Sequence, residues 1–388
     1  IAAMTDEEEL NALNSLWRNF CVSDAYEPGS TAKPFTLAAG LETGTLTGEE
    51  SYYCGGALDV ADYTIKCNNK NGHGQETTQD AIAYSCNVAL MEMAEKIGAE
   101  NFCRYQHIFG FGEYTGIDLP GEAATEALLY QADNMGEVEL ATNSFGQGFN
   151  VTMTQMVSAF SSLINGGYYY EPHMVSEITA SDGSVVQNIE PRLLKQTVSE
   201  ETSAKIRDYC LQVVIGEDGT GHTARPAGYL IGGKTGTAET QPRGNGEYVV
   251  SFMGYAPADD PEIAIYVVVD RPNAEKQDDA KFATRIVRSI LTEVLPYLDI
   301  FMTEPLSEEE QAELEEKIHK LETMIRKAKI VQEEDVKGDV VNVGLKVTVK
   351  DLDTGEKETF AIVGATESDP FNGKISTDSS VGKNPDRT

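Results

Sequence analysis

The chain has 388 residues, of which 40% are hydrophobic and 24% charged, a composition typical of folded globular proteins. This length favours two or three domains. Acidic residues number 63 and basic residues 30, and the net charge of -33 disfavours direct binding to nucleic acid or to anionic lipid surfaces. The longest apolar run, 263–269, is far shorter than the roughly 20 residues of a membrane-spanning helix. Without a starting Met or a signal-like segment, we expect a soluble piece of a longer protein.

Apolar spacing predicts three helices in the first half of the chain. They are expected, in chain order, at residues 30–40, 77–97 and 152–166. The first follows a Glu-Pro-Gly turn, and the third ends at Asn-Gly-Gly, a typical helix stop. Between the second and third helices, the Gly-rich stretch 100–150 is predicted to be irregular.

Residues 228–270 are predicted to be β, because three apolar or alternating runs are separated by polar turns at hairpin spacing. A long amphipathic helix follows at 280–298. Helices followed by an antiparallel sheet, closed by a last helix, predict an α+β fold.

The composition changes beyond residue 305, and we place a domain boundary near residue 306. Residues 306–330 are predicted to form a charged helix with a narrow apolar seam. Residues 331–388 then contain a second β-hairpin around a turn at 353–356 and a polar tail that we expect to be poorly ordered. Three parts are therefore predicted: 1–305, 306–330 and 331–388.

Six cysteines stand at 21, 54, 67, 86, 103 and 210. No C-x-x-C or H-E-x-x-H occurs and the histidines show no ligand spacing, so no metal site and no cofactor are predicted. Cys54 and Cys67 flank a predicted hairpin and could form a disulfide or remain free thiols. Their spacing does not distinguish between these two states. His73 and Cys86 are expected to be structural.

Three short motifs occur in a fixed order along the chain. They are S-x-x-K at 30–33, S-x-N at 85–87 and K-T-G at 234–236. The first is weak alone, because a second S-x-x-K occurs at 380–383. Together, in this order, the three motifs are typical of serine acyl-transferring enzymes.

The residue types fit that chemistry. Ser30 and Lys33 lie one helical turn apart, so the amine can act on the hydroxyl if its pKa is lowered by burial or by the charge of Lys234. The N–H groups of Ser30 and Thr237 are suited to stabilise a developing oxyanion. Ser85 is suited to relay a proton to the leaving group.

Three further side chains are suited to hold the substrate. Asn87 offers an amide to substrate backbone, and Thr235 and Thr237 offer hydroxyls to a terminal carboxylate beside Lys234.

Residues 26–305 resemble the transpeptidase domain of class B penicillin-binding proteins, through these motifs and phrases such as EPGSTAKPFT, ATNSFGQGFN and GGKTGTAE. The resemblance implies a penicillin-binding protein/β-lactamase-like antiparallel sheet with helices on both faces and a helical subdomain. It implies a serine D,D-transpeptidase that crosslinks peptidoglycan stem peptides through an acyl-enzyme on Ser30 and is acylated by β-lactams. The implied catalytic residues are Ser30, Lys33 and Ser85. The implied substrate-binding residues are Asn87, Lys234, Thr235, Gly236 and Thr237.

That family works outside the cytoplasmic membrane, which favours the Cys54–Cys67 disulfide. Its domain opens with two strands before the nucleophile helix, preceded by a pedestal domain and a membrane anchor. The segment before the nucleophile helix is too short and acidic here to supply these two strands, so we expect an N-terminally truncated domain. A membrane glycosyltransferase is an implied partner of the full-length parent.

Residues 317–383 are similar to the end of the coiled coil and part of the globular domain of Gre-type transcript cleavage factors, through phrases such as KLETMIRKAKI and VTVKDLDTGEKETFAIVG. This second resemblance implies RNA polymerase as a partner, in the cytoplasm, and no catalytic role. Because the two families work in different compartments, a chimera arising from engineering, gene fusion or assembly error is one alternative. A non-catalytic scaffold with a polymerase-binding module is the other.

Overall fold

The structure is a computed structural model that describes residues 5, 13, 15–327, 345–350, 357–364, 368–369 and 372–376. It divides the chain into two compact units, Ile1–Ser307 and Glu308–Thr388. The predicted turn at 353–356, most of the acidic start and the end of the polar tail lie outside the described residues.

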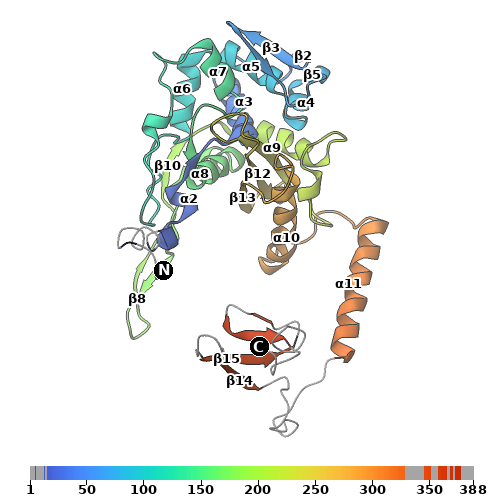
Figure 1. The fold of residues 1–388 in the computed structure, drawn as a ribbon. Helices are drawn as coiled ribbons and strands as arrows, with labels where there is room; N and C mark the ends of the chain where they lie inside the picture. The colour runs from blue at the N-terminus through green and yellow to red at the C-terminus, as the bar shows by residue number, and fades with distance from the viewer. Residues whose placement is uncertain are drawn as a thin grey trace. The chain divides into compact units, whose positions relative to one another are not determined.

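A three-stranded antiparallel sheet forms the centre of the first unit (Figure 1). Its strands are β11 (Gly232–Glu239), β12 (Tyr248–Ala256) and β13 (Ile263–Asp270), in that order across the sheet. All three match the predicted apolar runs, and the K-T-G motif lies in β11, where Lys234 pairs with Met253 of β12.

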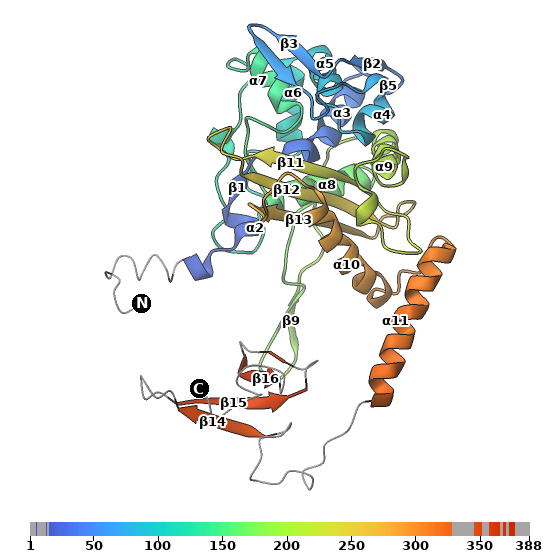
Figure 2. The same cartoon turned by 45° about the vertical axis from the view of Figure 1, so that its right-hand side comes forward.

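Helices cover both faces of this sheet, as predicted (Figure 2). Along β12, Phe252 belongs to the core under α10 (Lys281–Tyr297), whereas Tyr255 belongs to the other core and contacts Phe160 of α8 (Met153–Ile164), with ring centroids 6.1 Å apart. This alternation follows from the two-residue period of a strand. A further helix, α9 (Glu200–Ile215), was not predicted; it is capped by Ser199, whose side chain accepts from Thr202 N–H.

A helical subdomain carries the first two motifs. Its aromatic core includes Phe35, whose ring makes edge contacts at 5.2 Å with Phe109 and with Phe111. Its helices are α3 (Lys33–Glu42), α4 (Thr78–Ala83), α5 (Asn87–Ile97), α6 (Ala99–Ile108) and α7 (Glu137–Asn143). The last two fall within the stretch predicted to be irregular, so that prediction was wrong there.

The predicted single helix at 77–97 is also wrong, because the chain breaks between α4 and α5. Ser85 has φ of 60°, a left-handed conformation that ends a right-handed helix. Cys86 then starts α5 as its N-cap residue, with its sulfur accepting from Ala89 N–H. The S-x-N motif therefore lies in a kinked connection between two helices.

The predicted hairpin is present as β3 (Ala57–Val60) and β4 (Tyr63–Lys66). The other small antiparallel pairs among the described residues are β1 (Ala25–Tyr26) with β6 (Val151–Thr152), β2 (Ser51–Cys54) with β5 (Gly74–Thr77), β7 (Tyr168–Tyr170) with β10 (Leu193–Gln196), and β8 (Glu177–Thr179) with β9 (Val185–Asn188). Short helices complete this unit at α2 (Phe20–Ser23), η1 (Gly29–Ala32), η2 (Glu126–Leu128) and η3 (His222–Ala224).

The second unit begins with the predicted charged helix, α11 (Glu308–Lys327). The predicted hairpin follows as β14 (Lys346–Lys350) and β15 (Lys357–Val363). A third strand, β16 (Lys374–Ser376), pairs in parallel with β15, so part of the tail that we expected to be poorly ordered is a strand. Within the described residues of both units, no helix combines the length and the apolar character needed to cross a membrane.

Candidate active site

The three motifs converge on one cleft of about 390 Å³. Ser30 lies in η1, directly before α3, and Lys33 is the first residue of α3. The predicted site residues that line the cleft are Ser30, Ser85, Asn87, Thr235 and Thr237. Lys33 and Lys234 lie fully buried beneath it. The fold thus brings together residues more than 200 positions apart in the sequence.

Lys33 joins the first motif to the second. Its Nζ donates hydrogen bonds to the backbone oxygen of Ser85 at 2.6 Å, to Ser85 Oγ at 3.1 Å and to Asn87 Oδ1 at 2.8 Å. A protonated lysine amine has three donors, and these contacts use all of them. Deprotonation would free a lone pair, which the amine needs to act as a base.

Ser85 Oγ lies between the two buried lysines. Lys234 Nζ donates to it at 2.8 Å and also reaches the backbone oxygen of Thr235 at 3.2 Å. The hydroxyl therefore connects the amines of the first and third motifs. A buried network of this kind holds its members in one arrangement.

Burial lowers the pKa of Lys33 from its usual 10.5 to about 8, because the charged amine loses its hydration. The pKa of Lys234 is also lowered well below its usual value, first by burial and then by the charge of Lys33. Of the two causes considered from the sequence, burial is the one that lowers the pKa of Lys33, whereas the charge effect between the two amines lowers the pKa of Lys234. A neutral Lys33 is accessible near neutral pH.

The K-T-G strand packs closely against the segment that carries Ser30. A Cβ on Gly236 would lie 2.2 Å from Ser251 Oγ and 3.0 Å from Thr31 Cγ2, so only glycine fits here. Thr235 Oγ1 lies 2.7 Å from Thr220 Oγ1, which fixes that hydroxyl at the cleft wall. Thr220 had no signal in the sequence, because it belongs to no motif.

All six cysteines are free thiols, so the disulfide expected between Cys54 and Cys67 is not formed. Cys67 Sγ instead lies 3.9 Å from Cys86 Sγ, a distance at which the two thiols are in contact but not bonded. Cys54, Cys67, His73 and Cys86 form one cluster beside the cleft. Sequence spacing missed this cluster, since its members come from separate elements.

Comparisons with known proteins agree with the fold and the motifs. Residues 1–292 match the family model of the penicillin-binding protein transpeptidase domain. The chain is 41% identical over 288 residues to stage V sporulation protein D of Bacillus subtilis, covering 73% of this chain and 44% of that protein. It is 30% identical over 274 residues to the peptidoglycan D,D-transpeptidase MrdA of Acinetobacter baumannii, covering 64% of this chain and 40% of that protein.

A solved structure supports the same assignment. The transpeptidase domain of Burkholderia pseudomallei penicillin-binding protein 3 superposes with a TM-score of 0.66 at 26% identity, covering 75% of this chain and 85% of that one. The chain belongs to the penicillin-binding protein transpeptidase family. It spans less than half the length of the two curated relatives described above.

The second unit gives a separate match. Residues 335–384 match the family model of the C-terminal domain of the transcription elongation factors GreA and GreB. Both resemblances found in the sequence are therefore confirmed at the level of family.

Proposed function

We propose that the first unit is a serine D,D-transpeptidase that crosslinks peptidoglycan stem peptides and is acylated by β-lactams. The observation that carries the proposal is the convergence of the three motifs on one cleft, with Ser85 Oγ held between two buried lysine amines. The family match over residues 1–292 and the names of the curated relatives support the same reaction.

In the first half-reaction, Ser30 is the nucleophile. Neutral Lys33 accepts the proton of Ser30 Oγ, and the oxygen forms a bond to the carbonyl carbon of the penultimate D-Ala of a stem peptide. The backbone N–H groups of Ser30 and Thr237 stabilise the oxyanion. The terminal D-Ala leaves as an amine, and the proton that it takes up travels from Lys33 through Ser85.

In the second half-reaction, an amine of another stem peptide attacks the ester carbon of the acyl-enzyme. The new amide bond forms, the Ser30 C–O bond breaks, and the proton lost by the amine returns to Ser30 Oγ through the same groups. Lys234 stays beneath the cleft, and its hydrogen bond to Ser85 Oγ holds the relay hydroxyl in place.

Substrate binding uses the rim of the cleft. Asn87 holds the substrate backbone; its Oδ1 is fixed by Lys33, and its Nδ2 donates to Lys66 O at 3.3 Å. Thr235 and Thr237 bind the terminal carboxylate. Action on peptidoglycan implies work on the extracytoplasmic face of the membrane, with a membrane glycosyltransferase as partner of a full-length parent.

The test is an exchange reaction on a short pentapeptide that ends in D-Ala-D-Ala, with a labelled D-amino acid as acceptor. The proposal predicts release of one D-Ala for each labelled residue incorporated, inhibited by penicillin. Release without incorporation would indicate a hydrolase in place of a transpeptidase. Neither release nor incorporation by a chain that binds penicillin would contradict the substrate assignment.

For the second unit we propose a binding role toward RNA polymerase, supported by the match of residues 335–384 to the GreA/GreB C-terminal domain. This role would act in the cytoplasm, apart from the reaction above. The test is co-sedimentation of the full chain with core RNA polymerase, compared with a chain that ends at residue 307. Equal co-sedimentation of both chains, or none of either, would contradict the role.

A further inference from the structure

We propose that three cysteines and one histidine beside the cleft form a zinc site that holds the S-x-N segment in place. The four ligands are Cys54, Cys67, His73 and Cys86. Zinc binding itself does not depend on the transpeptidase function, whereas the predicted effect on acylation rests on that proposed function.

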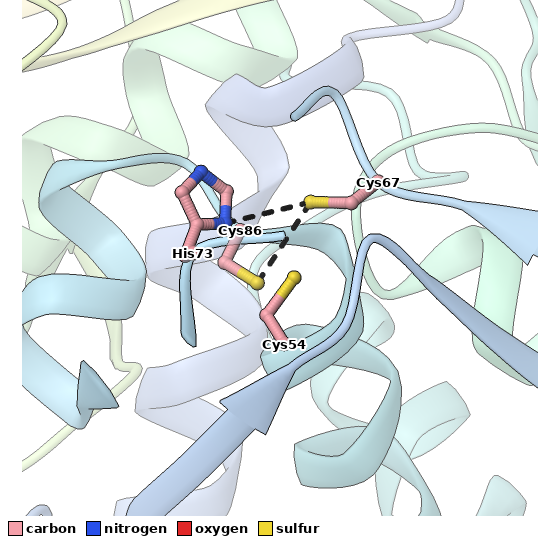
Figure 3. Close-up of side chains that lie close together, drawn as sticks. All are labelled: Cys54, Cys67, His73 and Cys86. Atoms are coloured by element: carbon pink, nitrogen blue, oxygen red, sulfur yellow. Dashed lines mark hydrogen bonds between the residues drawn. The ribbon is translucent and has the colours of Figure 1, made fainter. Parts of the chain in front are cut away.

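The donor atoms already have the spacing of a tetrahedral site (Figure 3). All four lie within 4.8 Å of one another. Cys67 Sγ is 3.9 Å from Cys86 Sγ and 3.7 Å from His73 Nδ1. Zn–S bonds of about 2.3 Å place two tetrahedral sulfur ligands about 3.8 Å apart, so a zinc ion fits with little movement.

The chemistry of the ligand set selects the metal. Three thiolates and one imidazole are a common set for structural zinc and lack the oxygen ligands that calcium or magnesium requires. The three cysteines are buried and His73 is partly exposed, which suits a closed site with little access for solvent. Four protein ligands leave no open coordination position, so the role is structural.

Three separate segments supply the ligands, because Cys67 and His73 both lie in the connection between β4 and β5. Cys54 ends β2, Cys67 follows β4, His73 precedes β5, and Cys86 caps α5. The backbone is built for their approach, because a Cβ on Gly72, at φ of +82°, would lie 2.2 Å from the backbone oxygen of Cys54. Only glycine allows this contact, which brings His73 next to the end of β2.

Backbone amides point at the sulfur atoms. Asn87 N–H donates to Cys67 Sγ at 3.3 Å, and Ala89 N–H donates to Cys86 Sγ at 3.4 Å. Such contacts from outside the ligand set orient metal-bound thiolates and offset their negative charge. The N-terminus of α5 thus faces two of the three thiolate ligands, where the helix dipole favours negative charge.

The site is directly connected to the candidate active site. Cys86 stands between Ser85, whose φ of 60° is strained for a non-glycine residue, and Asn87, which accepts from Lys33. A metal bond at Cys86 would hold this kink against relaxation. The four ligands are therefore positioning residues for Ser85 and Asn87, and none of them contacts the reacting atoms.

The first experiment measures metal content in the full chain, purified with reductant and dialysed against metal-free buffer. Plasma mass spectrometry should find about one zinc per chain. Cobalt substituted for zinc should give thiolate charge-transfer bands and the intense visible bands of tetrahedral Co²⁺. No bound metal in the reduced chain, or a Cys67–Cys86 disulfide in its place, would overturn the proposal.

Variants then distinguish loss of the zinc site from general destabilisation of the fold. Cys67→Ser and His73→Asn should each lower zinc affinity by at least about tenfold, whereas Cys103→Ser removes a buried thiol outside the cluster and should leave it unchanged. If Cys67→Ser fails to fold, competition by a chromogenic chelator on the parent chain gives the affinity directly. Zinc retained in full by both ligand variants would overturn the assignment.

The link to the cleft is tested by the rate of penicillin acylation. Removal of zinc by a chelator should slow acylation by about tenfold or more, and added zinc should restore it. An unchanged rate after complete removal would overturn the positioning role. A chain that binds one zinc but forms no penicillin adduct would contradict the proposed function and support the metal site. A chain that forms the adduct but binds no metal would contradict the metal site and support the proposed function.

Discussion

Lys234 Nζ donates a 2.8 Å hydrogen bond to Ser85 Oγ, although 149 residues separate the two in sequence. The contact joins the central sheet to the kink between two helices of the helical subdomain. Since Lys33 reaches the same hydroxyl at 3.1 Å, one serine connects both buried amines. The arrangement joins three short motifs in one hydrogen-bonded network.

The first prediction concerns that serine. Ser85→Ala removes the acceptor shared by both lysines and should lower the rate of penicillin acylation by about 100-fold or more, as expected for loss of a proton-transfer group. Ser85→Gly should lower the rate as much, while relieving the left-handed backbone strain and so unfolding less readily than the alanine variant. Normal acylation by both variants would exclude the relay.

The second prediction is a pH dependence of acylation. Burial lowers the pKa of Lys33 to about 8, and only the neutral amine can accept the proton of Ser30. The acylation rate should therefore rise about tenfold per pH unit below pH 8 and level off above it. Stopped-flow measurements with a chromogenic cephalosporin give this profile. A rate independent of pH in this range would contradict the role of Lys33 as base.

The same pKa shift predicts a pH dependence of stability. The pKa of Lys33 is about 8 in the folded chain and near 10.5 in the unfolded chain, so the unfolded state binds more protons between these values. The free energy of unfolding contributed by this group should rise with pH from about 8 to about 10.5. Urea titrations of the parent and of Lys33→Met at several pH values test this. The rise of the unfolding free energy with pH that Lys33 contributes should be absent from the variant.

The sequence predicted the sheet and the motifs for physical reasons that are local. The strands β11, β12 and β13 alternate or run apolar between polar turns, and each motif is a contiguous set of residues. The kink at Ser85 could not be predicted, since apolar residues such as Ile82 and Val88 continue a helical pattern on both sides of it. A left-handed serine gives no signal in residue type.

The cysteine cluster was missed for the opposite reason. Its ligands come from three separate segments, with spacings that match no short metal-binding motif. Strand pairing such as that of Cys54 with Gly74 brings these segments together. Lys234 could be predicted as a site residue because it belongs to the K-T-G motif. Its contact with Ser85 could not be predicted, because this contact depends on how the helical subdomain packs against the sheet.

The fourth prediction concerns the packing of the K-T-G strand. Gly236→Ala places a Cβ 2.2 Å from Ser251 Oγ and should destabilise the first unit by about 1–3 kcal/mol. Ser251→Gly in the same chain removes the nearest obstacle, so the double variant should recover part of the loss. Thermal unfolding of the four chains of this cycle measures the coupling, and additive effects would contradict the contact.

The most direct measurement is intact mass spectrometry after incubation with penicillin, on the parent chain, Ser30→Ala and Ser380→Ala. The last variant controls for the second S-x-x-K sequence, which lies outside the described residues. We predict one penicillin adduct on the parent and on Ser380→Ala, and none on Ser30→Ala. An adduct that persists on Ser30→Ala, or a parent chain that forms none, would contradict Ser30 as the nucleophile of an assembled site.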